Sequence, residues 1–197
     1  MENRITGHTK LYCLIGSPVG HSGSPAMYNY SFARTGEDGA YLAFDEPREP
    51  VGTAVEAIKT FHVKGFNITM PDKTAVMDYL DEISPAARLI GACNTVVVSE
   101  DGRLIGYNTD CQGFTDNLRA HGVEVKGKKL LILGTGGAAN AISIQTALEG
   151  AAEITIFNRR DEFFASGQRK VEKLSREVPD CRADMCHLED QNPQAEP

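Results

Sequence analysis

The sequence predicts an α/β fold in which buried strands alternate with amphipathic helices. Short apolar runs that end at a turn residue, such as Leu11–Gly16, predict strands. Apolar residues at helical spacing, as in Val51–Phe61, predict helices between them. The pattern of the amino-acid sequence changes near residues 120–128, which indicates a boundary between two domains. We therefore expect one domain at residues 1–121 and a second at 122–197.

The first region is expected to form a mostly parallel sheet with helices between its strands. Ser24 followed by Pro25 predicts an N-cap and a first helical turn. Asp101-Gly102 is a hairpin signal, so the strands on either side of it should pair antiparallel. Expected strands cover 11–16, 41–44, 65–69, 94–99 and 103–107, and expected helices cover 25–35, 51–61, 73–80, 84–90 and 110–121.

The second region is predicted to be a βαβ unit followed by one more helix. Lys129–Leu133 is a continuous apolar run, typical of a strand buried on both faces. A helix is expected at 138–150, a strand at 153–157 and a helix at 162–177. Beyond that helix the sequence turns polar, and no further strand is expected.

A glycine-rich turn joins the first strand and helix of this βαβ unit. Gly134-x-Gly136-x-x-Ala139 fits the dinucleotide fingerprint, with alanine at its third position. Backbone amides at the start of the following helix would face a pyrophosphate. The expected cofactor contacts are Gly134, Gly136, Gly137 and Ala138. The alternative is a purely structural turn between a strand and a helix.

The second strand of the unit ends in a charged turn, Asn158-Arg159-Arg160-Asp161. This is where the adenosine ribose of a bound dinucleotide should lie. An arginine would pair with the 2′-phosphate of NADP, whereas a carboxylate would accept a hydrogen bond from the free hydroxyl of NAD. Both residue types are present, so the choice between NADP and NAD stays open, as does the reading of a solvated turn.

Polar residues gather where the strands of the first region end, the usual ligand position in an open α/β sheet. They are Ser22, Ser24, Asn67, Thr69, Lys73, Asn94, Asn108 and Asp110. Each has an ordinary structural explanation, such as a helix cap, a turn or a solvated lysine. Together they are the kind of hydrogen-bonding and proton-transferring groups that a hydride-transfer substrate requires.

Four segments of the first region together resemble the shikimate dehydrogenases, and the glycine turn fits the same family. The segments are Ile15–Met27 (IGSPVGHSGSPAM), Gly65–Lys73 (GFNITMPDK), Gly91–Thr95 (GACNT) and Gly106–Asp110 (GYNTD). Asn158–Phe164 (NRRDEFF) looks most like the quinate/shikimate dehydrogenase branch, which accepts NAD as well as NADP.

The resemblance implies reversible, NAD(P)-dependent oxidation of shikimate to 3-dehydroshikimate in the shikimate pathway of aromatic amino acid biosynthesis, or of quinate in quinate metabolism. It implies a substrate-binding domain followed by a Rossmann-type dinucleotide-binding domain. By motif, Ser22 and Ser24 would hold the substrate carboxylate, and Asn67, Thr69 and Asn94 would contact the ring hydroxyls. Lys73 and Asp110 would form the catalytic pair beside the reacting oxygen.

Three departures from the family pattern bear on activity. Gly23 replaces a bulky apolar residue, and Cys111 replaces a glycine whose loss would strain Asp110 if that position needed a positive φ. The family's chain also continues well beyond this one, so the dinucleotide-binding domain is expected to be C-terminally truncated. The alternative function is an impaired family member that only binds ligand or cofactor. A purely structural module would leave the polar motifs without a purpose.

Composition excludes several other classes of function. A net charge of −7 argues against nucleic acid or an anionic membrane as a partner. Five cysteines without a Cys-x-x-Cys pair favour reduced thiols and a cytoplasmic location, and no metal site is expected. The sequence shows neither a signal peptide nor an apolar run long enough to span a membrane. The expected partner is a small-molecule substrate, and a homodimer is left open.

Overall fold

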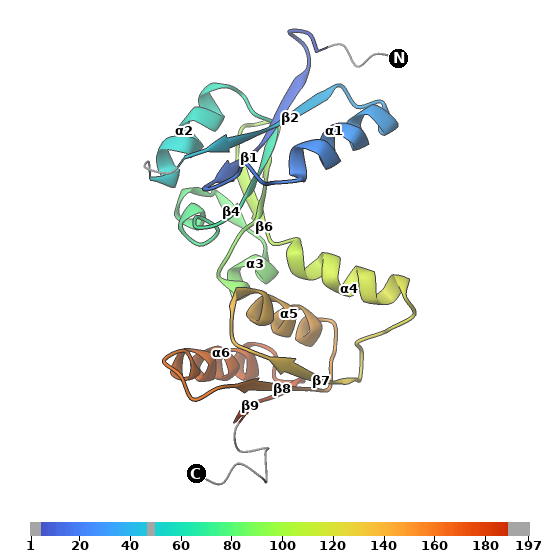
Figure 1. Cartoon of the computed structure of the whole chain (residues 1–197), viewed down its shortest axis with the longest axis vertical. Coiled ribbons are helices and arrows are strands. Elements are labelled where there is room, and N and C mark those ends of the chain that lie inside the picture. The colour runs from blue at the N-terminus through green and yellow to red at the C-terminus, as the bar shows by residue number, and fades with distance from the viewer. Residues whose placement is uncertain (1–4, 47–49, 189–197) are drawn as a thin grey trace. The chain divides into compact units, whose positions relative to one another are not determined.

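The computed structural model describes residues 5–46 and 50–188, and the chain divides after Asn108 into two compact units (Figure 1). The predicted α/β fold is confirmed: strands and helices alternate in both units. In the described ranges no helix is both long enough and apolar enough to cross a membrane.

The first unit is built on a six-stranded sheet whose order is β2-β1-β3-β5-β6-β4. Its strands are β1 (Lys10–Gly16), β2 (Gly39–Asp45), β3 (Gly65–Ile68), β4 (Glu82–Ile83), β5 (Thr95–Val98) and β6 (Leu104–Tyr107). β1 pairs parallel with β2 and β3, but β5 is antiparallel to both β3 and β6. β4 pairs parallel with β6, so β5 alone runs against the other five strands and the expected mostly parallel sheet is confirmed. The predicted Asp101-Gly102 hairpin accounts for the antiparallel pairing of β5 with β6.

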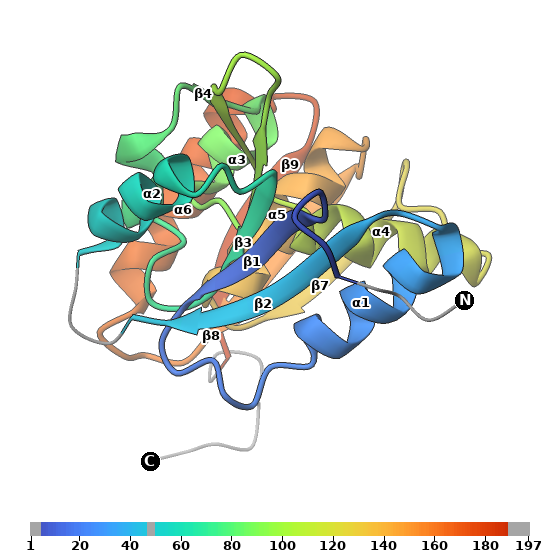
Figure 2. The same ribbon diagram turned by 90° about the horizontal axis from the view of Figure 1, so that it is seen from above.

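The side chains of β1 point alternately to the two faces of the sheet, and helices cover both faces. Cys13 and Ile15 pack toward α2 (Val51–Thr60) in the larger core cluster. Leu14 packs on the other face with Tyr41, beside aromatic rings of α1 (Ser24–Thr35). Figure 2 shows α1 and α2 on opposite sides of β1 and β2.

Two predicted helices of the first unit differ in detail. The N-cap of α1 is Gly23, and Ser24 is already helical, because the carbonyl of Gly23 accepts the first helical bond from Met27. The helix expected at 73–80 is a short 3₁₀ helix, η1 (Ala75–Tyr79). The helix expected at 84–90 is α3 (Pro85–Ile90), capped by the Ser84 side chain.

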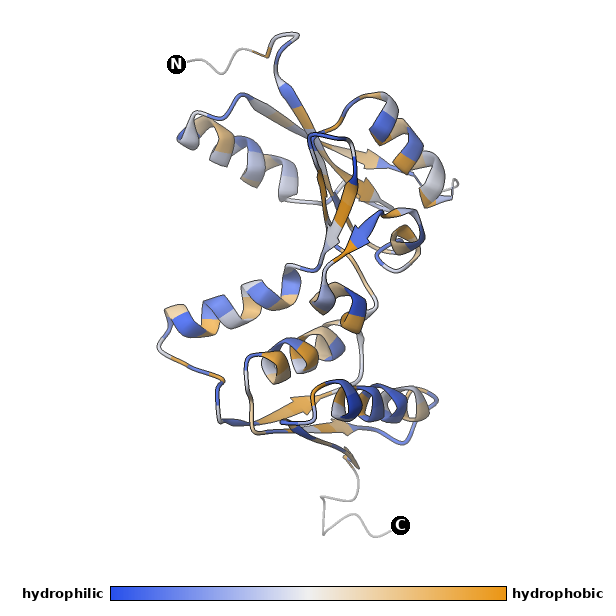
Figure 3. Cartoon of the chain, turned by 180° about the vertical axis from the view of Figure 1, so that it is seen from behind, coloured by the Kyte–Doolittle hydropathy of each residue, from blue (hydrophilic) through white to orange (hydrophobic). Residues whose placement is uncertain are grey.

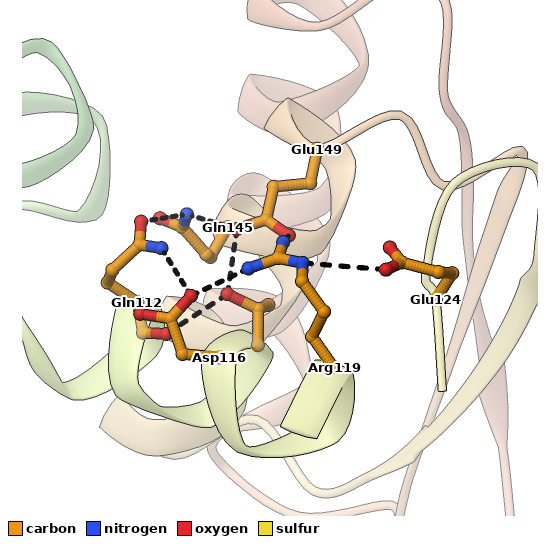
Figure 4. A network of polar contacts seen from close by, with 7 residues as sticks. Gln112, Asp116, Arg119, Glu124, Gln145 and Glu149 are labelled. Atoms are coloured by element: carbon orange, nitrogen blue, oxygen red, sulfur yellow. Dashed lines mark hydrogen bonds and ion pairs between the residues drawn. The ribbon is translucent and has the colours of Figure 1, made fainter. Parts of the chain in front are cut away.

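Helix α4 (Asp110–Ala120) groups with the second unit, so the division falls before this helix rather than at residue 121. The reason is a polar network with α5 (Gly137–Leu148), drawn in Figure 4. Glu149, which follows α5, accepts hydrogen bonds from Thr115 (2.7 Å) and Arg119 (3.0 Å) of α4. Thr115 is almost completely buried, so this contact holds α4 against α5.

The second unit is a three-stranded parallel sheet in the order β7-β8-β9. Its strands are β7 (Lys129–Leu133), β8 (Glu153–Asn158) and β9 (Arg182–His187), connected by α5 and α6 (Phe164–Glu177). The sequence analysis missed β9. The segment RADMCH has no β-branched residue, and it becomes a strand by pairing its backbone with β8.

Strand β7 is not buried on both faces, contrary to expectation. Leu131 and Leu133 are 64% and 68% exposed, respectively. In the described ranges α5 and α6 lie on one side of this sheet (Figure 1), so the apolar residues of β7 (orange in Figure 3) are covered from that side alone.

Candidate functional site

In the first unit, most of the predicted substrate residues lie at one edge of the sheet. β1 and β3 end at this edge, and β5 starts there because it runs antiparallel to β3. In the register, Asn67 lies between Leu14 and Thr95, and Thr95 lies opposite Tyr107. Asn94 and Asn108, each one residue beyond its strand, therefore belong to the same edge, and both are buried.

Hydrogen bonds join these residues directly. The Asn67 amide nitrogen donates to the Asn94 carbonyl (3.2 Å) and to the Thr95 hydroxyl (3.0 Å), while Asn67 Oδ1 accepts from the Tyr41 hydroxyl (2.7 Å). The Thr95 hydroxyl donates in turn to Asn94 Oδ1 (3.0 Å). Sequence reasoning missed Tyr41 and Thr95, since a strand tyrosine and threonine carry no motif signal of their own.

Thr69 follows β3 and is held by close packing against the end of β1. Its backbone N–H donates to the Ile15 carbonyl at 3.0 Å, and the Ser17 N–H donates to the Met70 carbonyl at the same distance. Gly16, with φ of +141°, makes this approach possible. A Cβ at Gly16 would lie 2.5 Å from Thr69 Cγ2 and 2.9 Å from the Met70 oxygen.

Lys73 lies on the turn between β3 and η1, half-buried, and its carbonyl accepts a 2.7 Å hydrogen bond from the Cys93 N–H. This bond ties the lysine backbone to the residue that precedes Asn94. The main-chain positions of Lys73 and Asn94 are therefore coupled, as two residues of one site would need to be.

The serine loop leads from β1 into α1. The Ser22 hydroxyl accepts a 3.2 Å hydrogen bond from the Ser24 N–H, and both serines are half-buried. Gly23 between them has φ of −79°, and a Cβ there would meet nothing within 4 Å. Neither the backbone nor the space around it requires glycine at this position.

Asp110 is the first residue of α4, and the buried Cys111 follows it inside the helix. The expected strain at Cys111 is not found: among the described residues other than glycine, His62 alone has a positive φ. Burial raises the pKa of the Cys111 thiol, so this side chain packs as a neutral group.

The glycine turn of the second unit has the geometry that a phosphate-binding turn needs. Gly134 has φ of +96°, which other residues rarely adopt, and its N–H donates to the Phe157 carbonyl (2.7 Å). Gly136 caps α5, and the first helical bond runs from Asn140 to the Gly136 carbonyl. The N–H groups of Gly137, Ala138 and Ala139 precede that bond, at the positive end of the helix dipole.

Space lies open above this turn, since a Cβ at Gly134, Gly136 or Gly137 would meet nothing within 4 Å. The far side is packed tightly. A Cβ at Gly167 of α6 would lie 2.6 Å from Thr135 Cγ2 and 2.7 Å from Met185 Cε. The turn is thus supported from behind and accessible in front, which fits a pyrophosphate.

The charged turn after β8 is organised by Asp161. Its carboxylate accepts hydrogen bonds from the Asn158 amide (2.9 Å) and from the Phe163 N–H (3.0 Å). Arg159 and Arg160 are exposed on the same turn. Asp161 therefore has a local structural role, while the exposed guanidinium groups present positive charge.

A pair of acidic side chains near the first-unit site escaped the sequence analysis. Both carboxylate oxygens of Glu46 are buried without a hydrogen-bond donor from the described residues. Burial, then the neighbouring Asp72 and Asp45, raise the pKa of Glu46 to about 7. Asp72 directly precedes Lys73, so this pair borders the loop that carries Thr69 and Lys73.

Comparison with known proteins agrees with these features. Residues 14–96 match the family model of the shikimate dehydrogenase substrate binding domain. Over 190 residues the chain is 46% identical to a shikimate dehydrogenase (NADP(+)) of Listeria monocytogenes, covering 96% of this chain and 65% of the relative. The resemblance to the shikimate dehydrogenases is therefore confirmed, over a chain that spans 65% of the length of that relative.

Two solved structures share the fold. The shikimate 5-dehydrogenase of Listeria monocytogenes, in complex with shikimate and NAD, superimposes with a TM-score of 0.91 at 45% identity, covering 96% of this chain and 65% of that one. The ligand-free 5-ketofructose reductase of a Gluconobacter strain superimposes with a TM-score of 0.86 at 34% identity, covering 93% and 64%.

Proposed function

We propose that this chain, which resembles the shikimate dehydrogenases along nearly its whole length, catalyses NAD(P)-dependent reversible oxidation of shikimate to 3-dehydroshikimate. The observation that carries the proposal is the sheet edge of the first unit, where the Asn67 side chain is hydrogen-bonded to Asn94 and the backbone of Thr69, just beyond the same strand, is hydrogen-bonded to Ile15. Such a frame of amide and hydroxyl groups suits a ring that carries several hydroxyls. The 46% identity to an NADP-dependent shikimate dehydrogenase supports this substrate.

Within this proposal, Ser22 and Ser24 bind the substrate carboxylate through their hydroxyls and the N–H groups of the loop around them. Asn67, Thr69 and Asn94 bind the ring hydroxyls. In functional terms, the substrate domain is proposed to cover residues 1–121, which are the first unit together with α4, although α4 packs with the second unit. The glycine turn and the β8 turn then belong to a cofactor domain at 122–197.

NADP or NAD is the proposed cofactor, and it supplies the hydride acceptor at its nicotinamide ring. Gly134, Gly136, Gly137 and Ala138 would hold its pyrophosphate through backbone N–H groups, for which the open space above the turn leaves room. Asn158, Arg159, Arg160 and Asp161 would contact the adenosine ribose. The exposed arginines favour the 2′-phosphate of NADP.

Lys73 and Asp110 are the proposed catalytic pair. An ammonium beside a carboxylate is oriented by it, and such a pair can exchange a proton with the substrate hydroxyl as the hydride leaves. The proposal rests on the match of both residues to the family motifs GFNITMPDK and GYNTD. Lys73→Ala with near-normal turnover would exclude the assigned role.

A second candidate is a chain that binds ligand or cofactor without turnover. The chain spans 65% of the length of the relatives that it matches. Ligand-induced stabilisation without turnover would support this candidate. The similarity to a 5-ketofructose reductase adds a ketose to the substrates worth testing, next to quinate.

The deciding experiment is an absorbance assay of reduced nicotinamide with the purified 197-residue chain. Shikimate, quinate and 5-ketofructose are each tested with NAD(H) and NADP(H). We expect turnover with shikimate that Asp110→Asn abolishes and the exposed Asp180→Asn leaves unchanged. If a folded sample shows no turnover but is still stabilised by shikimate, the binding-only candidate is favoured.

We further propose a cytoplasmic location and no nucleic-acid or membrane partner. All five cysteines lie in the described ranges and are free thiols, which agrees with a reducing compartment. The net charge of −7 would repel phosphate backbones and anionic lipids. Sedimentation of the purified chain would decide whether it forms a homodimer.

A further inference from the structure

Within the second unit, α4 is joined to α5 by a set of polar side chains. α4 contributes Gln112, Thr115 and Arg119, whose spacing of three and four residues puts them on one face of the helix. α5 contributes Gln145, and Glu149 directly follows its last residue. In Figure 4 the side chains of Gln112, Gln145 and Glu149 point toward one another. The contact between the two helices therefore includes directional bonds, which depend on the exact placement of one helix on the other.

The carboxylate of Glu149 is the centre of this set. One of its oxygens, Oε1, accepts hydrogen bonds from the Thr115 hydroxyl (2.7 Å) and the Gln145 amide (2.8 Å), and Oε2 accepts from the Arg119 guanidinium (3.0 Å). Thr115 and Gln145 are buried, and the Glu149 side chain is largely covered as well. Water therefore does not readily replace these bonds, and a buried carboxylate that lost a donor would be destabilised.

The Thr115 hydroxyl is the donor that tolerates the least movement of α4. Its oxygen also lies 3.1 Å from the Gln112 carbonyl of its own helix, but the contact with Glu149 is shorter and has a charged acceptor. A threonine has one side-chain torsion, which its branched Cβ restricts. Gln112 and Arg119 have longer side chains, which can follow a helix that shifts. The bond from Thr115 therefore selects one register of α4 on α5.

The two helices run in the same direction. Gln112 is bonded to Gln145 (3.0 Å), and further along both helices Arg119 is bonded to Glu149. Figure 1 shows this arrangement, with both helices starting toward the same side of the second unit. A slip of one residue would move α4 by about 1.5 Å along its axis and turn it by about 100°. Any such slip would displace the first residue of α4, Asp110, relative to the glycine turn that precedes α5.

We propose that Thr115 and Glu149 are positioning residues, which fix the register of α4 on α5 and thereby place Asp110 relative to the glycine turn. The inference rests on the proposed function, in which Asp110 takes part in proton exchange and the turn binds the cofactor. Asp110 and the turn both belong to the second unit, whereas Lys73 belongs to the first. The alignment of this carboxylate with the cofactor is then set within one unit, by the contact between α4 and α5.

The test separates turnover from binding in variants of these two residues. Thr115→Val keeps the shape of the side chain but removes its donor, and it should lower kcat roughly 10-fold, since a misplacement of about 1 Å can lower a rate about 100-fold. The KM of shikimate and the Kd of NADP⁺ should stay within about 2-fold of the wild type, because neither binding site changes. Thr115→Ser should restore kcat. Glu149→Gln should also lower kcat, because an amide oxygen is a weaker acceptor than a carboxylate.

Thr146→Val is the matched control. Thr146 is a second buried threonine of the same unit, 0% exposed against 1% for Thr115. Its hydroxyl donates to the carbonyls of Ile142 and Ser143 in its own helix, α5, and not across to α4. Both valine variants should therefore lower Tm to a similar extent, while Thr146→Val keeps the wild-type kcat.

The inference is overturned if Thr115→Val or Glu149→Gln keeps the wild-type kcat, if Thr115→Ser is as slow as Thr115→Val, or if Thr146→Val loses as much turnover. An equal loss of NADP⁺ affinity in Thr115→Val would also overturn it, since the whole unit would then be disturbed. If the wild type shows no turnover, the proposed function fails and hydrogen exchange of the α4 amides decides. Exchange should then be faster in Thr115→Val and unchanged in Thr146→Val, and equal rates in both variants would overturn the positioning role.

Discussion

The ammonium group of Lys170 donates a 2.9 Å hydrogen bond to the carbonyl of Thr135, in the middle of the glycine turn. Lys170 lies on α6, one helix away from the turn in sequence. The bond holds the Thr135 carbonyl toward α6, and so helps to keep the neighbouring N–H groups available in front. The conformation of the proposed cofactor-binding turn thus depends on a side chain that is distant in the sequence.

Lys170→Ala should weaken dinucleotide binding because the Thr135 carbonyl loses its donor and the turn gains freedom. We expect the Kd of NADP⁺ to rise roughly 3- to 10-fold, which corresponds to the net free energy of one ordinary hydrogen bond. Arg169→Ala, an exposed neighbour on the same helix, is the control. Equal Kd values for the two variants would exclude the supporting role of Lys170. Calorimetric titration gives both values.

Gly167→Ala should destabilise the second unit, although alanine normally favours a helix. The added Cβ would lie within 2.7 Å of atoms in Thr135 and Met185, so the close packing of α6 on the turn must open. We expect a loss of about 1 kcal/mol in the free energy of unfolding. In α4, a Cβ at Gly113 would meet nothing, and Gly113→Ala should gain about 0.5–1 kcal/mol. Urea denaturation measures both, and a stabilised Gly167→Ala would contradict the packing argument.

The stability of the first unit should fall as pH rises through the range set by Glu46. The pKa of this carboxyl is about 7 in the folded chain, above its ordinary value of 4.5, because of burial and the charges of Asp72 and Asp45. Between pH 4.5 and about pH 7 the folded state keeps a proton on Glu46 that the unfolded state releases. The contribution of Glu46 to the free energy of unfolding is therefore complete below pH 4.5 and is lost as the pH rises to about 7.

Glu46→Gln should remove this part of the pH dependence, an effect on the order of 1 kcal/mol once solvent screening is allowed for. Denaturation midpoints across pH 4 to 8 test it, with the exposed Glu172→Gln as the matched control. A Glu46→Gln profile parallel to the wild type would show that the carboxyl titrates normally in the folded chain.

Arg159→Ala should weaken NADP⁺ binding about tenfold and leave NAD⁺ binding unchanged, because only NADP carries the 2′-phosphate that an arginine pairs with. Asp161 does not compete for this role, since its carboxylate accepts from Asn158 and Phe163 within the turn. Arg169→Ala is again the control. If Arg159→Ala weakens the binding of NADP⁺ and of NAD⁺ equally, Arg159 does not contact the 2′-phosphate.

Local patterns predicted much of the fold and most of the candidate site. The hairpin at Asp101-Gly102, helix α2 and the glycine turn at Gly134 were all predicted, since each depends on residues close in the chain. The roles of Lys73 and Asp110 stay predictions. β9 was missed because its segment has no β-branched residue, and its strand conformation depends on backbone pairing with β8.

By itself, the amino-acid sequence determined the alternation of strands and helices, the glycine turn and the motifs that resemble the shikimate dehydrogenases. These are encoded by short-range conformational preference and by residue type. The tertiary structure alone decided that Leu131 and Leu133 are exposed and that the side chains of Asn67 and Thr95 are hydrogen-bonded between β3 and β5. Burial and hydrogen bonding depend on which atoms of different strands and helices come into contact. A local pattern of residue types does not specify these contacts.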